Sequence, residues 1–362
     1  MRPSEDSGRN MPGAREKCDL SLAGSGSFNV ERNLLNAAQI GRSVTGVKEY
    51  PGHCGNYISM RIQENRVEWD EERAKALPHQ VVRTTHRLVD TELFTDESLI
   101  RIFETHDPDY LLVYRMGSDH TKLDDFELGK RGNLSSTELL EAVKQGKYWL
   151  NILRMQDCHA EFAELINGVY DELEAKMPGF RAYFRSANLL VSSPSAQVYF
   201  HADAPLNMLW HMRGQKKVYV YPPNDERFAP AEHVEMIFTR ESDDDLPYDP
   251  SFDEFATAYE LDPGQMITWP QNTPHRVENV SGLNVSLTTE HFTPEGIRKR
   301  NTYLANHYLR RWLRLPMRST RTDGFLPALK RAAYYACKRL PLAKAEAFED
   351  SADFSLQDQV KE

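Results

Sequence analysis

The sequence VYFHAD, residues 198–203, is the most informative stretch of this chain. Successive side chains of a β-strand alternate between its two faces, so His201 and Asp203 would point to the same side, together with Tyr199. A later histidine from another strand, His275, would add a second imidazole to this pair. Two imidazoles and one carboxylate on one side of an ion leave its other positions open. The pattern therefore predicts a three-ligand metal site.

Two other pairs of histidine and acid within the chain serve as internal controls. His159 and Glu161 lie in a strongly helical run, residues 157–176, where side chains two positions apart point to different sides and cannot share an ion. His233 and Glu235 follow a polar stretch broken by proline, which gives little support for a strand. We therefore interpret both pairs as structural.

The residues after this stretch predict a β-hairpin. Residues 207–212 and 215–221 are rich in β-forming side chains, and the Arg-Gly dipeptide between them suits a two-residue turn. Pairing across that turn would place Lys216 on an apolar, inward face, where a lysine is costly to bury unless it meets an anion. The residues alone leave three interpretations open: an anion-binding Lys216, a Lys216 paired with a carboxylate, and a solvated Lys216 with Lys217 facing inward.

Further motifs accompany the same segment. These are HAD at 201–203, RGQKK at 213–217, DPGQMITWP at 262–270, PHRVEN at 274–279 and NVSLTT at 284–289. Together they resemble the JmjC, or cupin-like, branch of the Fe(II)- and 2-oxoglutarate-dependent oxygenases, over roughly residues 180–292. The resemblance implies an α+β protein with a double-stranded β-helix, or jelly-roll, core. The short strands punctuated by Ser-Pro and Pro-Gly agree with that fold.

The resemblance also implies roles for individual residues. The iron ligands of the family fall on His201, Asp203 and His275. Its strand lysine, which binds the distal carboxylate of 2-oxoglutarate, falls on Lys216, and its supporting asparagine falls on Asn207. Fe(II) is therefore the expected metal and 2-oxoglutarate the expected co-substrate. In such enzymes a C–H bond of the substrate is oxidised with O₂ while 2-oxoglutarate becomes succinate and CO₂.

Two positions need separate treatment. Val198 stands where hydroxylases of this branch often carry a threonine for the co-substrate, so we expect Tyr199, Tyr110 or Tyr114 to supply the second anchor. His211 would face the same interior as the lysine. A packed core residue, or a group that orients a ligand, is favoured over a metal ligand, since three ligands are present without it.

The expected reaction is hydroxylation of a protein side chain or a small molecule. The family's hydroxylases carry an aspartate at this ligand position, and the chain shows no accessory reader or zinc module. No catalytic group beyond the metal ligands is expected. A different class stays open: a cupin-like metal-binding protein without oxygenase activity, such as a sugar isomerase or a nucleic-acid-associated regulator. An isomerase would need no lysine for a dicarboxylate, and a regulator would show salt-dependent binding to nucleic acid.

The length of 362 residues is enough to bury a full core. We divide the chain into a disordered leader (1–30), a mixed α/β flanking region (31–179), the cupin-like core (180–292) and a basic helical C-terminal region (293–362). No run of eighteen apolar residues and no apolar signal core occurs, and the four cysteines lack metal or disulfide spacing. These features predict a cytoplasmic enzyme without a membrane span.

Charge is unevenly distributed along the chain. Residues 293–344 carry thirteen lysines and arginines against two acids, although the whole chain has a net charge of −10. The tail predicts an amphipathic helix, and we favour packing on the body or a homodimer through C-terminal helices over binding to nucleic acid. The acidic stretches 241–245 and 249–254 would attract a basic substrate if they overhung the site.

Overall fold

The computed structural model describes residues 66–117, 121, 126–239, 246–338 and 354–360. The leader predicted for residues 1–30 and the acidic stretch 241–245 lie outside these residues. The strands are β1 (Val82–Thr85), β2 (Leu111–Arg115), β3 (Glu127–Lys130), β4 (Tyr148–Ile152), β5 (Tyr183–Ser192), β6 (Gln197–His201), β7 (Leu206–Val220), β8 (Thr257–Leu261), β9 (Gln265–Thr268), β10 (His275–Phe292) and β11 (Phe354–Ser355). The α-helices are α2 (Glu71–Ala76), α3 (Asp96–Thr105), α4 (Ser136–Gln145), α5 (Met155–Cys158), α6 (Ala160–Lys176), α7 (Ala231–Thr239), α8 (Pro294–Leu313), α9 (Phe325–Lys338) and α10 (Leu356–Val360).

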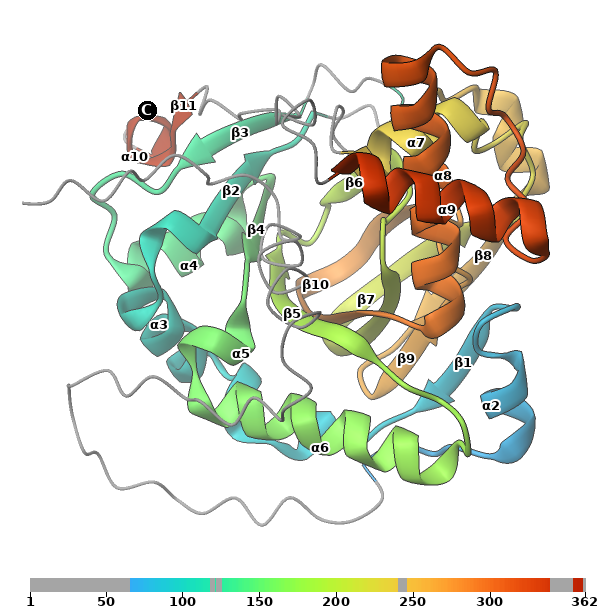
Figure 1. The fold of residues 1–362 in the computed structure, drawn as a ribbon. Coiled ribbons are helices and arrows are strands. Elements are labelled where there is room, and N and C mark those ends of the chain that lie inside the picture. Colours follow the sequence, from blue (N-terminus) through green and yellow to red (C-terminus); the bar gives the residue numbers. More distant parts are fainter. Residues whose placement is uncertain (1–65, 118–120, 122–125, 240–245, 339–353, 361–362) are drawn as a thin grey trace, which may run out of the picture.

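Two long strands, β7 and β10, form the frame of the fold. They run antiparallel and pair along nearly their whole lengths, from His275 opposite Val220 to His291 opposite Leu206. The last part of β7 also pairs with β8, and the first part of β10 with β6. The first part of β7 instead pairs with β9, and the last part of β10 with β5. Each strand therefore contributes to both a smaller and a larger sheet, β7 entering the larger one first and β10 the smaller one first, and the two sheets enclose an interior (Figure 1).

The larger sheet continues beyond the two long strands. At one edge β1 pairs with β9, and at the other β4, β2, β3 and β11 follow β5 in that order. The pair of β11 and β3 is parallel, whereas the pairs that build the two-sheet core are antiparallel. Helices flank this core, which confirms the predicted α+β double-stranded β-helix. Strands from both sides of residue 180 share one sheet.

The hairpin predicted at Arg213 and Gly214 is wrong. β7 continues through both residues without reversing and bends there, with Gly214 at φ 79°. β10 bends beside it, where the pairing register shifts between Ser281 and Val285. A glycine that permits positive φ serves a corner between two sheets as well as it serves a turn, so the local sequence did not distinguish the two.

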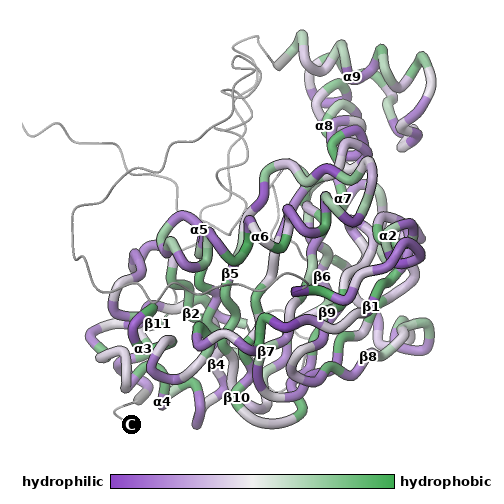
Figure 2. The backbone as a smooth tube through the Cα atoms, turned by 90° about the horizontal axis from the view of Figure 1, so that it is seen from below, coloured by the Kyte–Doolittle hydropathy of each residue, from purple (hydrophilic) through white to green (hydrophobic). Residues whose placement is uncertain are grey.

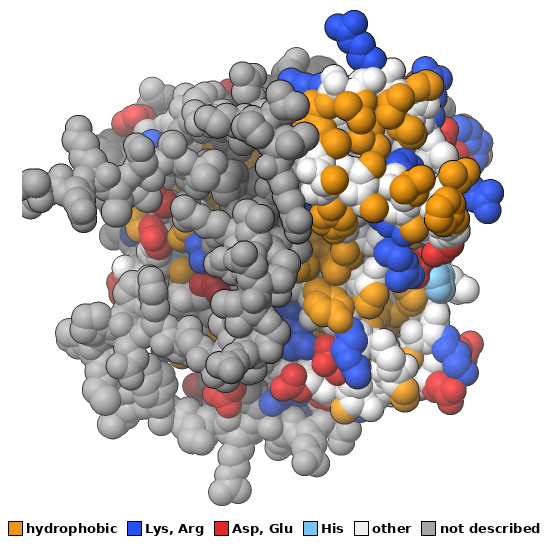
Figure 3. Space-filling model, in the orientation of Figure 1, with side chains coloured by type: hydrophobic (Ala, Val, Ile, Leu, Met, Phe, Trp, Pro, Cys, Tyr) orange, Lys and Arg blue, Asp and Glu red, His pale blue; other side chains and the backbone are white. Residues whose placement is uncertain are grey.

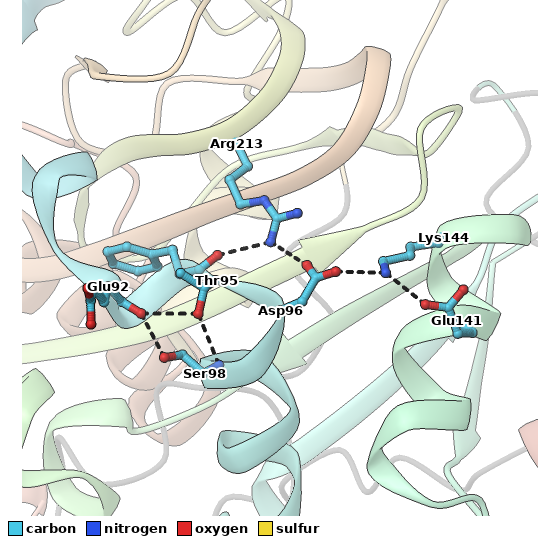
Figure 4. Close-up of polar contacts among 8 residues, drawn as sticks. Glu92, Thr95, Asp96, Ser98, Glu141, Lys144 and Arg213 are labelled. Atoms are coloured by element: carbon cyan, nitrogen blue, oxygen red, sulfur yellow. Dashed lines mark hydrogen bonds and ion pairs between the residues drawn. The ribbon is translucent and has the colours of Figure 1, made fainter.

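A polar network ties this corner to the helices outside the sheet (Figure 4). Arg213 Nη1 donates to Asp96 Oδ1 over 2.7 Å and to the Phe94 carbonyl over 3.0 Å. Asp96 begins α3, and its other oxygen lies 2.8 Å from Lys144 Nζ of α4. The hydrogen bond from Lys144, followed by that from Arg213, lowers the pKa of Asp96. The carboxylate therefore bridges the β7 corner and two helices in its charged form.

The main core lies between the larger sheet and α3, α4 and α6. Side chains that point outward from the sheet, such as Leu189, Met208 and Leu287, pack with apolar residues of these helices. Hydrophobic segments run through β2, β4 and β5 of this sheet (Figure 2). Full burial of such a side chain contributes roughly 1.5 to 3 kcal/mol. Helix α4 begins at a complete capping box formed by Ser135 and Glu138, which fixes its first turn. Helices thus cover the outer face of this sheet, which leaves the inner face for the site.

The C-terminal helices cover a second apolar cluster. Leu304 and Leu309 of α8 pack with Ile237 of α7 and with Phe200, whose side chain points away from the interior. Helix α9 packs on α8 but leaves an apolar face exposed over this part of the molecule (Figure 3). This face contains Phe325, Leu326, Leu329 and Tyr335. In the described part of the chain, no helix is both long enough and apolar enough to cross a bilayer.

Candidate metal centre and cavity

The three predicted metal ligands meet at one end of the interior. His201 ends β6, Asp203 follows two residues later, and His275 begins β10 directly opposite His201. Their candidate ligand atoms all lie within 4.8 Å of one another, and no other such group of histidines, cysteines and acids occurs among the described residues. The imidazole centroids of His201 and His275 are 4.2 Å apart. Strand pairing therefore brings together residues that are 74 positions apart in the sequence.

Backbone carbonyls orient both imidazoles. Nδ1 of His201 lies 2.8 Å from the Tyr199 carbonyl, and Nδ1 of His275 lies 3.1 Å from the Thr273 carbonyl. A carbonyl only accepts, so each Nδ1 carries the proton and each Nε2 keeps its lone pair for a metal. Burial, followed by the nearby His201, lowers the pKa of His275 to about 3. This imidazole is therefore neutral at ordinary pH, as metal binding requires.

Further contacts hold the carboxylate and the second imidazole in place. Asn207 Nδ2 donates to Asp203 Oδ2 over 3.0 Å, and Asn272 Nδ2 donates to the Asp203 carbonyl over 2.8 Å. The Trp269 ring packs against His275 at a centroid distance of 4.2 Å. Asn207 Oδ1 is buried without a hydrogen-bond partner among the described residues. The donor set of two imidazoles and a braced carboxylate fits a divalent transition metal, with room for further ligands.

A cavity of about 160 Å³ opens beside the three ligands. Its lining residues come from β2, β4, β5, β6, β7 and β10 and from the loops that carry Asp203 and Trp269. They are Tyr114, Trp149, Asn151, Asn188, Leu190, Val198, Tyr199, His201, Asp203, Ala204, Pro205, Asn207, Leu209, Trp269, His275, Val277, Thr288 and Glu290. The predicted residues Tyr199 and Asn207 thus lie at the cavity, and so does Tyr114. Tyr110 does not; its hydroxyl accepts a hydrogen bond from Arg154 over 2.6 Å.

Lys216 points into the interior, but it is not one of the residues that line this cavity. Its side chain is buried, with 4% exposure, whereas Lys217 points outward and pairs with Glu260 at 3.3 Å. Burial lowers the pKa of Lys216 to about 7. No carboxylate among the described residues lies within ion-pair distance of its ammonium group. Of the three interpretations left open, the solvated lysine and the carboxylate pair do not fit these described residues.

His211 is a structural residue of the β7 corner. It is fully buried, with Nδ1 3.0 Å from Ser286 Oγ and Nε2 3.0 Å from the Gly214 carbonyl. The carbonyl accepts, so Nε2 donates to it and Nδ1 accepts from the serine hydroxyl. Both ring nitrogens are used, which agrees with the core role favoured from the sequence.

The two control pairs do not form metal sites. His159 stacks on His106 in the main core, with Nε2 3.0 Å from Nδ1 of His106. His233 and Glu235 lie on helix α7, and the Glu235 carboxylate pairs with Arg310 of α8. In the acidic stretch 249–254, Asp253 does not face the cavity. It pairs with Arg276 at 2.7 Å on the outer side of β10.

Sequence reasoning missed two groups that line the cavity. Glu290 of β10 is half-buried beside Asp203, and Trp149 of β4 stacks on Tyr114 of β2 at a centroid distance of 4.7 Å. Burial, followed by the charge of Asp203, raises the pKa of Glu290 to about 8. Strand alternation from Thr288 could have found Glu290, because two residues along a strand share a face. Trp149 gave no such signal, since its position depends on pairing between distant strands.

The chain belongs to the cupin-like domain family, whose model matches residues 38–289. This confirms the family predicted from the motifs. A structure of YcfD from Escherichia coli is similar at 14% identity and a TM-score of 0.44, over 76% of this chain and 71% of that one. A structure of YcfD described as a ribosomal oxygenase in complex with cobalt and 2-oxoglutarate is similar at 15% identity and a TM-score of 0.41, over 72% of this chain and 64% of that one. No curated protein sequence matches.

Proposed function

We propose that this chain is a hydroxylase that depends on Fe(II) and 2-oxoglutarate. The proposal rests on one observation: the same interior contains a cluster of candidate metal ligands at one end and a buried lysine toward the other. At one end are two imidazole Nε2 atoms and the Asp203 carboxylate, and toward the other is Lys216, a buried lysine without a counter-ion among the described residues. A metal would satisfy the first and a dicarboxylate co-substrate the second. One YcfD structure is described as a complex with a metal, cobalt, and with the dicarboxylate 2-oxoglutarate.

His201, Asp203 and His275 would hold the iron. The carbonyls of Tyr199 and Thr273 fix the ring orientation and tautomer of the two histidines, and Asn207 fixes the rotamer of the aspartate. When bound, iron, 2-oxoglutarate and O₂ supply the oxidising power that converts a C–H bond into a C–OH group, with succinate and CO₂ as the other products. The protein contributes fixed ligand geometry and a pocket with apolar walls.

Strand register indicates how Lys216 would reach the co-substrate. His275 pairs with Val220, Val277 with Val218, and Asn279 with Lys216. The lysine therefore lies two same-face positions beyond His275, or about 13 Å along the strand at 3.3 Å per residue. A five-carbon dicarboxylate that extends from the metal, together with the lysine stem, suits that separation. Leu209, Val218 and Val277 form apolar contacts between these two ends.

The remaining assignments are part of the same proposal. Asn207 and Tyr199 would contact the co-substrate carboxylate nearer the metal, and Tyr114 is the third candidate at the cavity. Val198 cannot donate a hydrogen bond from its side chain, so an oxygen or nitrogen from one of these neighbours must replace that contact. Hydroxylation is proposed over demethylation because Asp203 is the carboxylate ligand. The isomerase and the nucleic-acid regulator remain alternatives, and a sugar isomerase gives no reason for a buried Lys216.

We also propose that the protein forms a homodimer and that it is cytoplasmic. The apolar face of α9 is the surface on which a second copy would pack, because single exposed apolar residues are common but a contiguous group is not. The substrate is a protein side chain or a small molecule.

Succinate formation tests the proposed reaction. The purified protein is supplied with Fe(II), 2-oxoglutarate and O₂, with and without a mixture of candidate peptides, and succinate is quantified. We expect O₂-dependent succinate that is absent from His275→Ala and is retained by His233→Ala, a matched change on α7. Absence of succinate from the iron-loaded protein in every mixture would contradict the proposal.

A further inference from the structure

Glu290 is an acidic residue that lines the cavity but is not one of the three candidate metal ligands. It lies on β10, opposite Asn207 of β7 and Ser186 of β5, and it lines the same cavity as Asp203. Ser186 Oγ donates to its Oε2 over 3.1 Å, and Asn188 Nδ2 donates to its Oε1 over 3.3 Å. These two neutral donors fix the position of the Glu290 carboxyl group but supply no positive charge.

Two other acids with buried or partly buried side chains are paired with arginine. Glu235 pairs with Arg310, and Glu174 pairs with Arg185 at 2.6 Å. For Glu290, in contrast, none of the described lysines and arginines forms an ion pair with its carboxylate, and the charge of Asp203 disfavours its ionised form. A carboxylate that is partly buried without a cation is costly to keep. Such a group indicates a partner that arrives with the substrate.

Charge balance in the proposed complex supports a cationic partner. This argument rests on the proposed function. A divalent iron, the Asp203 carboxylate, the dianion of 2-oxoglutarate and the ammonium of Lys216 together carry no net charge. Ionised Glu290 would add one negative charge, and its burial beside Asp203 makes that charge unfavourable until a cation meets it. A single positive charge on the substrate would balance it, whereas a neutral substrate would leave it unpaired.

The walls near this carboxylate fit an organic cation. Tyr114 and Trp149 stack with an interplanar angle of 23° and both line the cavity. Asn151 and Asn188 add amide groups to the same lining. Aromatic faces attract ammonium and guanidinium groups, and a carboxylate adds a directional, charge-assisted hydrogen bond. The cavity thus combines the two elements that recognise such a cation.

We propose that Glu290 is the specificity-determining residue of the site and binds an ammonium or guanidinium group of the substrate. The cation would lie between this carboxylate and the aromatic wall, and Asp203 beside it would place the metal within reach of a carbon near the charged group. Basic side chains of a peptide, and small amines of similar shape, share this chemistry. Neutral and acidic side chains do not.

Binding to the protein loaded anaerobically with Fe(II) and 2-oxoglutarate tests this role without turnover. The probes are N-α-acetyl-lysine amide and N-α-acetyl-arginine amide, each compared by calorimetry with its neutral counterpart, the norleucine and the citrulline derivative. We expect at least one cationic probe to bind about tenfold more tightly than its counterpart, because the contact is a charge-assisted hydrogen bond in a partly buried site.

Glu290→Gln should abolish that preference, and Glu290→Asp should retain part of it. Glu278→Gln is the matched control, since Glu278 lies on β10 but faces outward and accepts a hydrogen bond from Tyr219; it should leave the preference unchanged. A wild-type protein that binds cationic and neutral probes equally overturns the inference, as does a preference that survives Glu290→Gln. The same titrations report 2-oxoglutarate affinity: if 2-oxoglutarate fails to bind the iron-loaded wild type, the proposed function fails, whereas normal 2-oxoglutarate binding without a preference for cations rejects only the role of Glu290.

Discussion

The metal end and the lysine end of the interior differ in how far their polar groups are satisfied. At the metal end, both histidines donate to backbone carbonyls and the aspartate accepts from Asn207, so the ligand atoms are already oriented. At the lysine end, Lys216 is as deeply buried as His275, yet it has no counter-ion among the described residues. The first end is organised by contacts within the protein, whereas in the proposed function a carboxylate of 2-oxoglutarate completes the second. The two ends should therefore respond differently to mutation.

The largest expected effect is loss of iron from the metal end. Alanine in place of His201, Asp203 or His275 should weaken Fe(II) binding by more than the roughly 10- to 100-fold that loss of an outer partner costs. Asn207→Ala removes such an outer partner and should fall within that range. Iron stoichiometry after anaerobic loading, measured by a colorimetric chelator, tests whether the ligand variants lose more iron than Asn207→Ala. Full iron occupancy in all three ligand variants would contradict the site.

Removal of charge from the lysine end should leave iron binding intact. Lys216→Met keeps most of the apolar stem, and 2-oxoglutarate affinity should fall by roughly tenfold to a hundredfold, because a charge-assisted contact contributes about 1.5 to 3 kcal/mol. Lys217→Met is the matched control, since Lys217 points outward to Glu260. Calorimetry of the iron-loaded proteins measures both. Equal 2-oxoglutarate affinities for wild type and Lys216→Met would remove this lysine from the site.

The bend of β7 at Gly214 lets one strand contribute to both sheets, so the metal end and the lysine end lie in the same interior. A Cβ at Gly214 would lie 2.7 Å from Asn284 Nδ2 while the residue keeps φ 79°, so Gly214→Ala should lower the free energy of unfolding by about 1 to 3 kcal/mol. Gly179 has a similar positive φ with nothing within 4 Å, and Gly179→Ala should cost less. Chemical denaturation compares the two. A smaller effect at Gly214 than at Gly179 would argue against the corner.

Low pH should decrease the free energy of unfolding of the metal-free protein, because several histidines away from the metal ligands are buried in their neutral form. Burial lowers the pKa of His86 and His106 to about 4 and that of His211 to about 3. The unfolded chain binds protons at these residues below about pH 6.5 while the folded chain does not, so stability is fully present above that pH and falls as the pH drops toward 4. Each group adds a slope of up to about 1.4 kcal/mol per pH unit. Urea unfolding between pH 7 and 5 measures it, and an increase in stability over this range would contradict these burials.

The three candidate metal ligands could be named from the sequence because each lies in a recognisable local pattern, and the structure brings them together. The spacing of His201 and Asp203 matches strand alternation, and His275 belongs to a motif of its own. The inward direction of Lys216 was also anticipated, although through a hairpin that does not exist. Gly214 gives the same local signal for a turn and for a bend, and only the continued pairing of β7 with β10 distinguishes them.

Residues that depend on pairing between distant strands could not be predicted in the same way. Trp149 reaches the cavity because β4 extends the larger sheet beside β5, and nothing in its own neighbourhood indicates that position. Tyr114 was one of three candidate tyrosines, and only the pairing of β2 with β4 separates it from Tyr110. Glu290 lies near the opposite end of β10 from His275, and alternation from Thr288 indicates that it faces inward. Its closeness to Asp203 depends on pairing between distant strands and could not be read from the sequence.

Anaerobic titration of the iron-loaded protein with 2-oxoglutarate is the most direct measurement of the central claim, that both ends of this interior bind one co-substrate. A weak visible charge-transfer band should appear only when Fe(II) and 2-oxoglutarate are present together. It should saturate at one equivalent in wild type, require higher 2-oxoglutarate concentrations in Lys216→Met, and be absent from His275→Ala. A wild-type protein that binds Fe(II) stoichiometrically but shows no band, and no calorimetric binding of 2-oxoglutarate, would contradict the account.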